Sequence, residues 1–390
     1  MFILTETCKF KLEPTEEQRK ILEELFSAYR SMVEECLKSA MSMNITSRKR
    51  LHESIYGELR RKFGGYPSHY IYTAITLALG MYKSYRRLSR KRNDIRPPSA
   101  ERLKAVLLDD THLFWFGWGS LKIATHKGHL TIPFKLHEHA EKFKDWYVKG
   151  SRLVKDGDEY YLHVTFKKDV EEKEYEGLLG IDVNEKSIDL AIIKPDKVRF
   201  VKIDISETKY IRDRYFKKRQ SIQRKTKGKV KARLLAKYSK RERRRVDAIL
   251  HKASKIVAEI VAEEKVKPVM ENLKNIRERI RYGRRMNRRL HSMPFRRVQF
   301  SIFYKSIERG YKPEYVDAKD TSKMCPICGG LNKPNGHIYK CRKCGFQADR
   351  HFVAAWNIAA KLQMCRPSPL AAKAIREALK AEVERIAIKC

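Results

Sequence analysis

Two Cys-x-x-Cys pairs constrain the fold of this chain more strongly than any other feature of its sequence. The first pair is Cys325 and Cys328 and the second is Cys341 and Cys344, with twelve residues between the pairs. Each pair forms a tight turn whose two thiolates converge, and the short segment between them brings four sulfurs around one Zn²⁺ ion at about 2.3 Å. Because four protein ligands leave no open coordination position, we expect structural zinc. Two disulfides or four free thiols are the alternatives.

Glycines and the remaining cysteines agree with a metal site. Gly329-Gly330 and Gly345 directly follow the two pairs, where such a turn needs positive φ. The other four cysteines, too few for a disulfide scaffold, are Cys8, Cys36, Cys365 and Cys390. This usage favours a reduced compartment and one metal site. We therefore expect an intracellular, cytoplasmic protein.

The chain is strongly basic. Its 390 residues contain 86 Lys and Arg against 47 Asp and Glu, so the formal net charge is +39. The excess positive charges repel one another unless a polyanion neutralises them. Nucleic acid is a better candidate for this polyanion than an anionic membrane. With 42% apolar residues the chain can bury a core, which excludes global disorder. We find no basic segment leading into an apolar one at the N-terminus and no apolar run of membrane-spanning length, so we expect neither a secretory signal nor a membrane partner.

The first 170 residues predict a small β domain that a helical region interrupts. Apolar alternation predicts a strand over residues 2–12. Apolar residues recur at helical spacing after the capping box Thr15–Gln18 and again after Pro67-Ser68, so each segment predicts a helix. The helical region ends at Pro97-Pro98. Two later hairpins complete the β part, which we expect to be one small sheet or barrel. The predicted boundaries are 1–13 and 99–170 for the β domain and 14–98 for the helical insertion.

From Leu178 onward the pattern is that of a mixed α/β sheet. Three short apolar strands come first, at 178–183, 188–193 and 198–205. A long basic helical region reaches about Glu264. It is followed by a strand at 266–270, a helix at 295–309, a strand at 313–316 and a helix from about Arg350. This order suggests a sheet of the ribonuclease H type. The predicted boundaries are 171–177 for a linker, 178–320 and 348–365 for the α/β domain, 321–347 for the zinc module and 366–390 for a C-terminal helix.

Two acidic residues belong to apolar strands. Asp182 lies within Leu178–Val183, and Glu271 ends Val266–Glu271. A carboxylate there costs free energy unless it is paired or binds a cation. On adjacent strands the two acids could share divalent ions, and phosphodiester cleavage by two metals uses one ion to activate water and the other to stabilise the leaving oxygen. The alternative is that each acid pairs with one of the many basic side chains.

Asp349 and His351 stand at the predicted start of the helix that follows the zinc module. Small Ala354 and Ala355 behind them allow close packing. Their local sequence alone also fits two simpler roles, a helix N-cap for Asp349 and an ordinary surface imidazole for His351.

Basic residues concentrate in two segments. Between Lys209 and Lys252 nineteen Lys or Arg stand against three acids, and Arg277–Arg289 adds a patch directly after Glu271. A helical pair with such a face neutralises many backbone phosphates and gives salt-dependent binding without sequence readout. A solvated charged face is the alternative. Composition alone identifies the ligand only as nucleic acid.

At these residues the chain resembles the TnpB/OrfB proteins of bacterial and archaeal insertion sequences, relatives of the type V CRISPR effector nucleases. The matching pieces occur in the family's order over about residues 178–363: Gly180–Glu185, Val269–Leu273, Thr321-Ser322 and Asp349–Ile358. The resemblance implies an α+β multidomain protein. Its RuvC-like, RNase H-like domain would contain a zinc ribbon and would follow a wedge-like β domain with a helical recognition insertion, to which Pro67–Tyr70 adds N-terminal support.

The resemblance also implies the activity of a mobile-element protein, namely RNA-guided cleavage of DNA with Mg²⁺, and guide RNA and target DNA as partners. It implies a prokaryotic, nucleoid-associated protein. Asp182 matches the first catalytic acid and Glu271 the second. The family usually shows Asp-Arg-Asp before an Asn-Ala-Ala-x-Asn run, and the third ligand lies six residues before the final Asn. Here Asn357 is that Asn, so His351 stands at the ligand position and Asp349 matches the other acid.

Because His351 stands where the family usually has an aspartate, the sequence does not decide whether the chain cleaves DNA. Neutral imidazole binds divalent metals but suits Mg²⁺ less well than carboxylate does. The chain could therefore cut with His351, use Asp349 from a shifted position, or act as a nuclease-inactive RNA-guided DNA-binding protein. A non-enzymatic zinc-ribbon RNA-binding protein is a further alternative, but it leaves the in-strand Asp182 unexplained.

Overall fold

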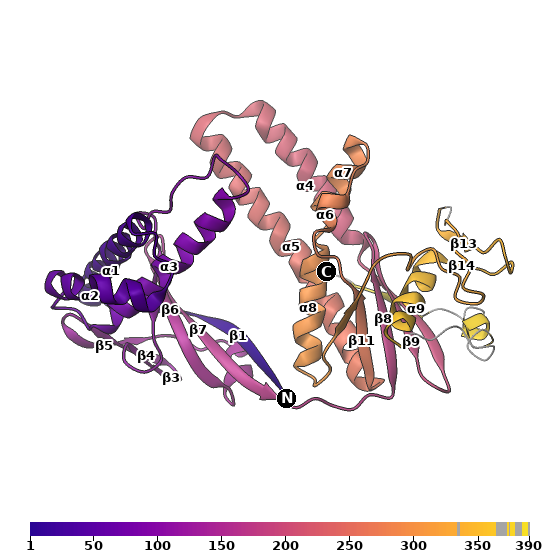
Figure 1. The fold of residues 1–390 in the computed structure, drawn as a ribbon, viewed down its shortest axis with the longest axis horizontal. Coiled ribbons are helices and arrows are strands. Elements are labelled where there is room, and N and C mark those ends of the chain that lie inside the picture. The colour runs from indigo at the N-terminus through magenta and orange to yellow at the C-terminus, as the bar shows by residue number, and fades with distance from the viewer. Residues whose placement is uncertain (334–335, 364–372, 374, 379–383, 389–390) are drawn as a thin grey trace. The chain divides into compact units, whose positions relative to one another are not determined.

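A computed structural model describes residues 1–333, 336–363, 373, 375–378 and 384–388 (Figure 1). Its internal contacts divide the chain into two compact units. The N-terminal unit comprises Ile3–Asp169, and the C-terminal unit comprises the chain from Val170 together with Met1–Phe2. Each unit is described by itself.

The N-terminal unit contains two antiparallel sheets. The four-stranded sheet has the order β1 (Phe2–Lys11), β7 (Glu159–Val170), β6 (Tyr147–Asp156) and β2 (Ala105–Leu108). The three-stranded sheet consists of β3 (Phe114–Gly117), β4 (Ser120–Thr125) and β5 (Gly128–Pro133). Both predicted hairpins, β4–β5 and β6–β7, are confirmed. The β part, predicted as one small sheet or barrel, consists of two sheets rather than one. The isolated bridge Leu12 to Phe134 joins them, and aromatic rings pack between them, for example Phe10 on Phe116.

Three helices are inserted between β1 and β2: α1 (Glu16–Ser42), α2 (Arg48–Lys62) and α3 (His69–Ser89). The predicted capping box is present at α1, where Thr15 Oγ1 accepts a hydrogen bond from the Gln18 N–H at 3.3 Å and Gln18 Oε1 accepts one from the Thr15 N–H at 3.1 Å. The buried Tyr70 hydroxyl donates to the Ala124 carbonyl at 2.7 Å, which fixes α3 on the three-stranded sheet. Sequence reasoning missed α2, because its sequence is mostly polar and buries only Leu51, Ile55 and Leu59. A short 3₁₀ helix, η1 (Glu138–Phe143), precedes β6.

A six-stranded mixed sheet forms the centre of the C-terminal unit. Its order is β12 (Glu314–Val316), β11 (Val266–Glu271), β8 (Gly177–Val183), β9 (Ser187–Ile193), β10 (Val198–Asp204) and β15 (Glu384–Ala387). β9 is antiparallel to both neighbours, whereas β11 pairs parallel with β8 and β12. The predicted mixed sheet and its three leading strands are confirmed.

Helices cover both faces of this sheet (Figure 1). Leu179 and Ile181 pack with residues of α5 (Gly228–Glu263) and α8 (Phe295–Ile307). Leu178 and Val269 face α9 (Arg350–Gln363). On the same face of β8, Gly180 lies so close to α9 that a Cβ atom at this residue would be 1.8 Å from the Ala355 carbonyl oxygen. The strand and the helix can therefore meet only at glycine.

The remaining described elements of this unit are α4 (Ser206–Lys225), α6 (Ile276–Arg279), α7 (Arg284–Ser292), β13 (Ile338–Lys340) and β14 (Gln347–Asp349). Most of the C-terminal helix predicted over 366–390, with Cys365 and Cys390, lies outside the described residues. Of the described residues in this range, 373 and 375–378 are helical, as predicted, whereas 384–387 form strand β15, parallel to β10, so the helix prediction is wrong there. The apolar side chains of Ile386 and Ile388 alternate with polar ones and pack against the sheet core, which is a strand pattern. None of the described helices has the length and apolar character needed to cross a membrane.

Candidate functional site

The sheet brings the two predicted strand acids onto one face. In the parallel pairing of β8 with β11, Ile181 lies opposite Met270, and the next residue of each strand is Asp182 and Glu271. Asp182 alternates with Leu178 and Gly180, and Glu271 with Val269, so both acids share the α9 side of the sheet. The two carboxylates therefore stand at the carboxyl ends of neighbouring strands.

Glu271 is a buried and perturbed carboxylate. Burial and, to a smaller extent, the negative charge of Asp182 raise its pKa to about 7, against a lowering contribution from the Thr321 hydroxyl, which donates to its Oε1. Gln299 fixes its backbone by donating from Nε2 to the Glu271 carbonyl at 2.7 Å. A divalent cation would reverse this shift, because it stabilises both ionised acids.

Asn357 holds the segment that carries Thr321. Its amide nitrogen donates to the Thr321 carbonyl at 2.7 Å and to the Met324 carbonyl at 2.8 Å, and the Asn357 side chain is buried. α9 thus fixes the hydroxyl that binds Glu271. Sequence reasoning placed Thr321 and Asn357 only in matching segments and missed this contact.

His351 reaches the strand acids, whereas Asp349 does not contact them. His351 Nδ1 lies 3.2 Å from Asp182 Oδ2. Asp349 Oδ1 instead accepts from the His351 backbone N–H at 2.9 Å at the start of α9, and its Oδ2 accepts from Lys202 Nζ at 2.9 Å. Burial alone would raise the Asp349 pKa, but these two hydrogen bonds hold it below its usual value. Asp349 therefore has the local contacts of a capping residue.

A third strand acid, Asp189, was missed by sequence reasoning. It lies on β9 directly opposite Asp182 and is fully buried. Ligand atoms of Asp182, Asp189 and His351 all lie within 4.8 Å of one another, and Asn184 Nδ2 donates to both carboxylates, at 2.6 Å and 3.1 Å. The signal was available, since Asp189 interrupts the apolar strand Ser187–Ile193 as Asp182 interrupts its own.

Lys202 compensates part of this negative charge. Its Nζ lies 3.3 Å from Asp189 Oδ1 and donates to Asp349. Burial lowers the pKa of Lys202, but the two carboxylates more than offset this and raise it overall. Burial raises the pKa of Asp189, although Ser187 and Lys202 act against that shift. A cavity of about 750 Å³ adjoins the network and is lined in part by Asn184, Lys202, Arg289, Arg350 and His351.

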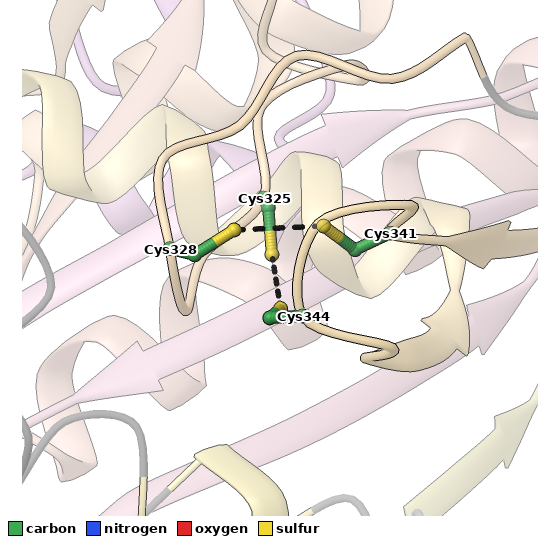
Figure 2. Close-up of side chains that lie close together, drawn as sticks. All are labelled: Cys325, Cys328, Cys341 and Cys344. Atoms are coloured by element: carbon green, nitrogen blue, oxygen red, sulfur yellow. Dashed lines mark hydrogen bonds between the residues drawn. The ribbon is translucent and has the colours of Figure 1, made fainter.

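The four predicted cysteines meet at one point (Figure 2). Cys325 Sγ lies 3.7 Å from Cys344 Sγ, and Cys328 Sγ lies 3.5 Å from Cys341 Sγ. Four thiolates at about 2.3 Å from Zn²⁺ in a tetrahedron lie roughly 3.8 Å apart, so the cluster has the right size for the ion. All four cysteines are free, and the sulfurs are too far apart for the alternative of two disulfides.

The turns of the cluster also have the expected backbone. Gly329 and Gly345 have φ of 70° and 71°, and each donates its N–H to the carbonyl of the first cysteine of its pair. Burial raises the pKa of the Cys341 thiol, but backbone N–H groups of Cys344 and Lys343 and the neighbouring thiols outweigh this effect and lower the pKa to about 6. Burial raises the pKa of Cys325 and Cys344 in the metal-free cluster. Four sulfur donors at this spacing are a donor set that fits zinc.

The predicted basic helical region forms the helices α4 and α5, which lie against each other as a long hairpin (Figure 1). Only the second half of α5, from Val246, is buried against the sheet. All three acids of the segment are paired: Asp213 with Lys209, Glu242 with Arg219 and Asp247 with Arg297. Most of the remaining Lys and Arg side chains between residues 229 and 245 are exposed.

Comparison with known proteins shows which family this chain belongs to. TnpB-like protein MJ0751 of Methanocaldococcus jannaschii is 36% identical over 263 residues, which cover 64% of this chain and 94% of that protein. The chain belongs to the TnpB-like family. The model of the Cas12f1-like TNB domain matches residues 295–358, and that of the uncharacterized protein MJ0013 family matches residues 25–124. The predicted relation to TnpB proteins and type V effectors is confirmed.

More distant relatives of this TnpB-like chain include a protein named as a nuclease. CRISPR-associated endodeoxyribonuclease Cas12f1 of Sulfoacidibacillus thermotolerans is 33% identical over 117 residues, 29% of this chain and 26% of that protein. The cryo-EM structure of a Cas12f1–sgRNA–target DNA complex matches with a TM-score of 0.57 and 14% identity, over 92% of this chain and 99% of that one. The two proteins share an α+β multidomain fold.

Proposed function

We propose that this TnpB-like chain is an RNA-guided DNA endonuclease with a RuvC-like, Mg²⁺-dependent site at Asp182, Glu271 and His351. The observation that carries the proposal is the position of Asp182 and Glu271 on one face, at the ends of adjacent parallel strands, with His351 in contact with Asp182. The family relationship and a relative named as an endodeoxyribonuclease support the reaction.

Each residue has a stated part in this proposal. Bound Mg²⁺ would supply the activation of water and the stabilisation of the leaving oxygen. Asp182 and Glu271 would hold it, while Asn184 and Thr321 orient the two carboxylates. His351 adds either a nitrogen ligand or a group that moves a proton at Nδ1. Asp349 stays with Lys202 and does not enter the site.

Nucleic acids and zinc complete the proposal. The α4–α5 hairpin and α7 supply basic surface for the phosphates of a guide RNA and of its duplex with target DNA. The four-cysteine cluster holds one structural Zn²⁺ as a zinc ribbon. The N-terminal unit then corresponds to the wedge-like domain with its helical recognition insertion.

The test is guide-dependent cleavage. The protein, purified with its bound RNA, is expected to cut DNA that matches the guide when Mg²⁺ is present, and Asp182→Ala should abolish cutting without weakening DNA binding. Asp196→Ala removes an exposed acid from the β9–β10 turn and should leave cutting unchanged. His351→Asp restores the family's usual ligand and should increase the rate. Cutting that survives Asp182→Ala, or guide-dependent binding without any cutting by the wild type, contradicts the proposal.

A further inference from the structure

A second cluster of metal-binding side chains lies in the N-terminal unit. His69 is the first residue of α3, and Asp109 and His112 belong to the connection between β2 and β3. One ligand atom of each residue lies within 4.8 Å of the other two. None of the three takes part in the site or the zinc module described above.

The Asp109 carboxylate occupies the middle of this cluster in a fixed orientation. Its Oδ1 accepts hydrogen bonds from the backbone N–H groups of Thr111 at 2.9 Å and His112 at 2.7 Å. His69 Nδ1 lies 3.0 Å from Oδ2, and His112 Nδ1 lies 3.4 Å from Oδ1. The two imidazole rings stack with centroids 3.6 Å apart and planes inclined by 22°. Both rings therefore turn the same nitrogen toward one carboxylate.

These separations fit a tetrahedral transition-metal ion. With ligands at about 2.0–2.1 Å from Zn²⁺, two neighbouring ligand atoms lie roughly 3.3–3.4 Å apart. His69 Nδ1 lies 3.0 Å from Asp109 Oδ2 and His112 Nδ1 lies 3.4 Å from Asp109 Oδ1, so each imidazole nitrogen is near that separation from one oxygen of the carboxylate and within reach of an ion bound to it. Two imidazoles and one carboxylate form a donor set for Zn²⁺ and similar ions rather than for Mg²⁺.

We propose that His69, Asp109 and His112 form a metal site for Zn²⁺ or a similar divalent transition-metal ion, separate from the four-cysteine cluster. An ion there cross-links the start of α3 to the connection between β2 and β3. Three protein ligands leave one coordination position for a fourth, external ligand.

A cavity beside the cluster leaves room for that fourth ligand. Its volume is about 660 Å³, and all three proposed ligands line it. Arg48, Lys149 and Arg152 line the same cavity, and Lys149 pairs with Asp110 at 3.4 Å. These positive side chains favour an anionic fourth ligand, such as hydroxide or phosphate, which offsets the charge of the ion.

The experiment measures bound zinc in the full-length protein. Wild type and variants are dialysed against the same free Zn²⁺ concentration, and Zn²⁺ per chain is determined by mass spectrometry. Wild type should bind one Zn²⁺ more than His112→Ala and one more than Asp109→Asn, which keeps the shape of Asp109 and an oxygen acceptor for its turn. His129→Ala is the matched control, because this imidazole lies edge-on to Trp115 outside the cluster, and it should bind as much as wild type.

Cobalt distinguishes loss of the site from loss of the fold. After Co²⁺ replacement, the sulfur-to-cobalt absorption of the four-cysteine cluster should be the same in all four proteins, and far-UV circular dichroism should be unchanged. Equal zinc content in wild type, His112→Ala and Asp109→Asn would overturn the proposal. In that case the cluster is a hydrogen-bonded clamp with no metal.

Discussion

Glu271 shows how burial and one neighbouring charge raise the pKa of a carboxylate. Its pKa of about 7 means that the metal-free protein keeps a proton there at pH values where an ordinary glutamate is ionised. Thr321 donates to this carboxylate and thereby orients it. A divalent ion bound at Glu271, as proposed, would replace this proton, so its affinity should rise with pH.

The pH dependence of stability tests this environment. Because the pKa of Glu271 is raised from 4.5 to about 7 on folding, its stabilising contribution is complete below about pH 4.5 and is lost as the pH rises through 7. Between about pH 5 and pH 7 the metal-free wild type should therefore lose about 2 kcal/mol more free energy of unfolding than Glu271→Gln. Urea unfolding in the presence of a chelator measures both proteins. Parallel pH profiles would contradict the raised pKa.

At the scale of elements, the contact of β8 with α9 decides whether the site can form. Gly180 lets the α9 backbone approach the strand that carries Asp182, and the same helix carries His351 at its start and Asn357 in its second half. α9 therefore positions the potential ligand His351. Through Thr321 it also fixes the orientation of the Glu271 carboxylate.

Gly180→Ala should separate these elements. The added Cβ would lie 1.8 Å from a backbone oxygen, which no side-chain rotation can relieve, so α9 must shift. We expect a loss of about 3 kcal/mol or more in the free energy of unfolding, together with loss of any cleavage activity. Gly283→Ala is the control, because a Cβ there meets nothing within 4 Å. Thermal and urea unfolding of both variants measure the difference, and a stable, active Gly180→Ala protein would contradict this role of α9.

Elements with strong periodicity could be predicted from the sequence, and contacts between distant segments could not. The apolar runs of β8, β9 and β11 and the capped start of α1 carry local signals, and the cysteine spacing predicts the four-sulfur cluster. β15 carries only a short alternation, which an amphipathic helix also accommodates, and its place beside β10 depends on tertiary packing. Likewise, the link from Asn357 through Thr321 to Glu271 joins three segments that no local pattern relates.

At the scale of the whole molecule, charge is concentrated rather than uniform. The first half of α5 extends beyond the buried core, and its acids are few and paired. A surface of this kind binds phosphates mainly by releasing counterions, so its contribution should appear in the salt dependence of nucleic-acid binding.

Neutralising this surface should reduce that dependence. Replacing the exposed Lys237, Lys240 and Arg244 of α5 with Gln should weaken RNA binding most at low salt. The slope of log K against log[salt] should become shallower by about 0.7–0.9 for each phosphate that the variant no longer neutralises. Filter binding or fluorescence anisotropy over a salt series measures the slope.

The control removes the same charge elsewhere. Gln replaces three cations of the zinc module, namely Lys333, Lys340 and Arg342. A slope that falls equally in both triple variants would show that net charge, and not the α5 surface, governs binding.

The order of the site residues along the chain has a consequence for synthesis. Asp182 and Asp189 are made early, Glu271 follows, and His351 and Asn357 come last, on the helix that covers all of them. A nascent polypeptide therefore has the acids without the helix until α9 has left the ribosome. Translation that stops before this helix yields a basic polypeptide that has the proposed nucleic-acid surface but no assembled centre.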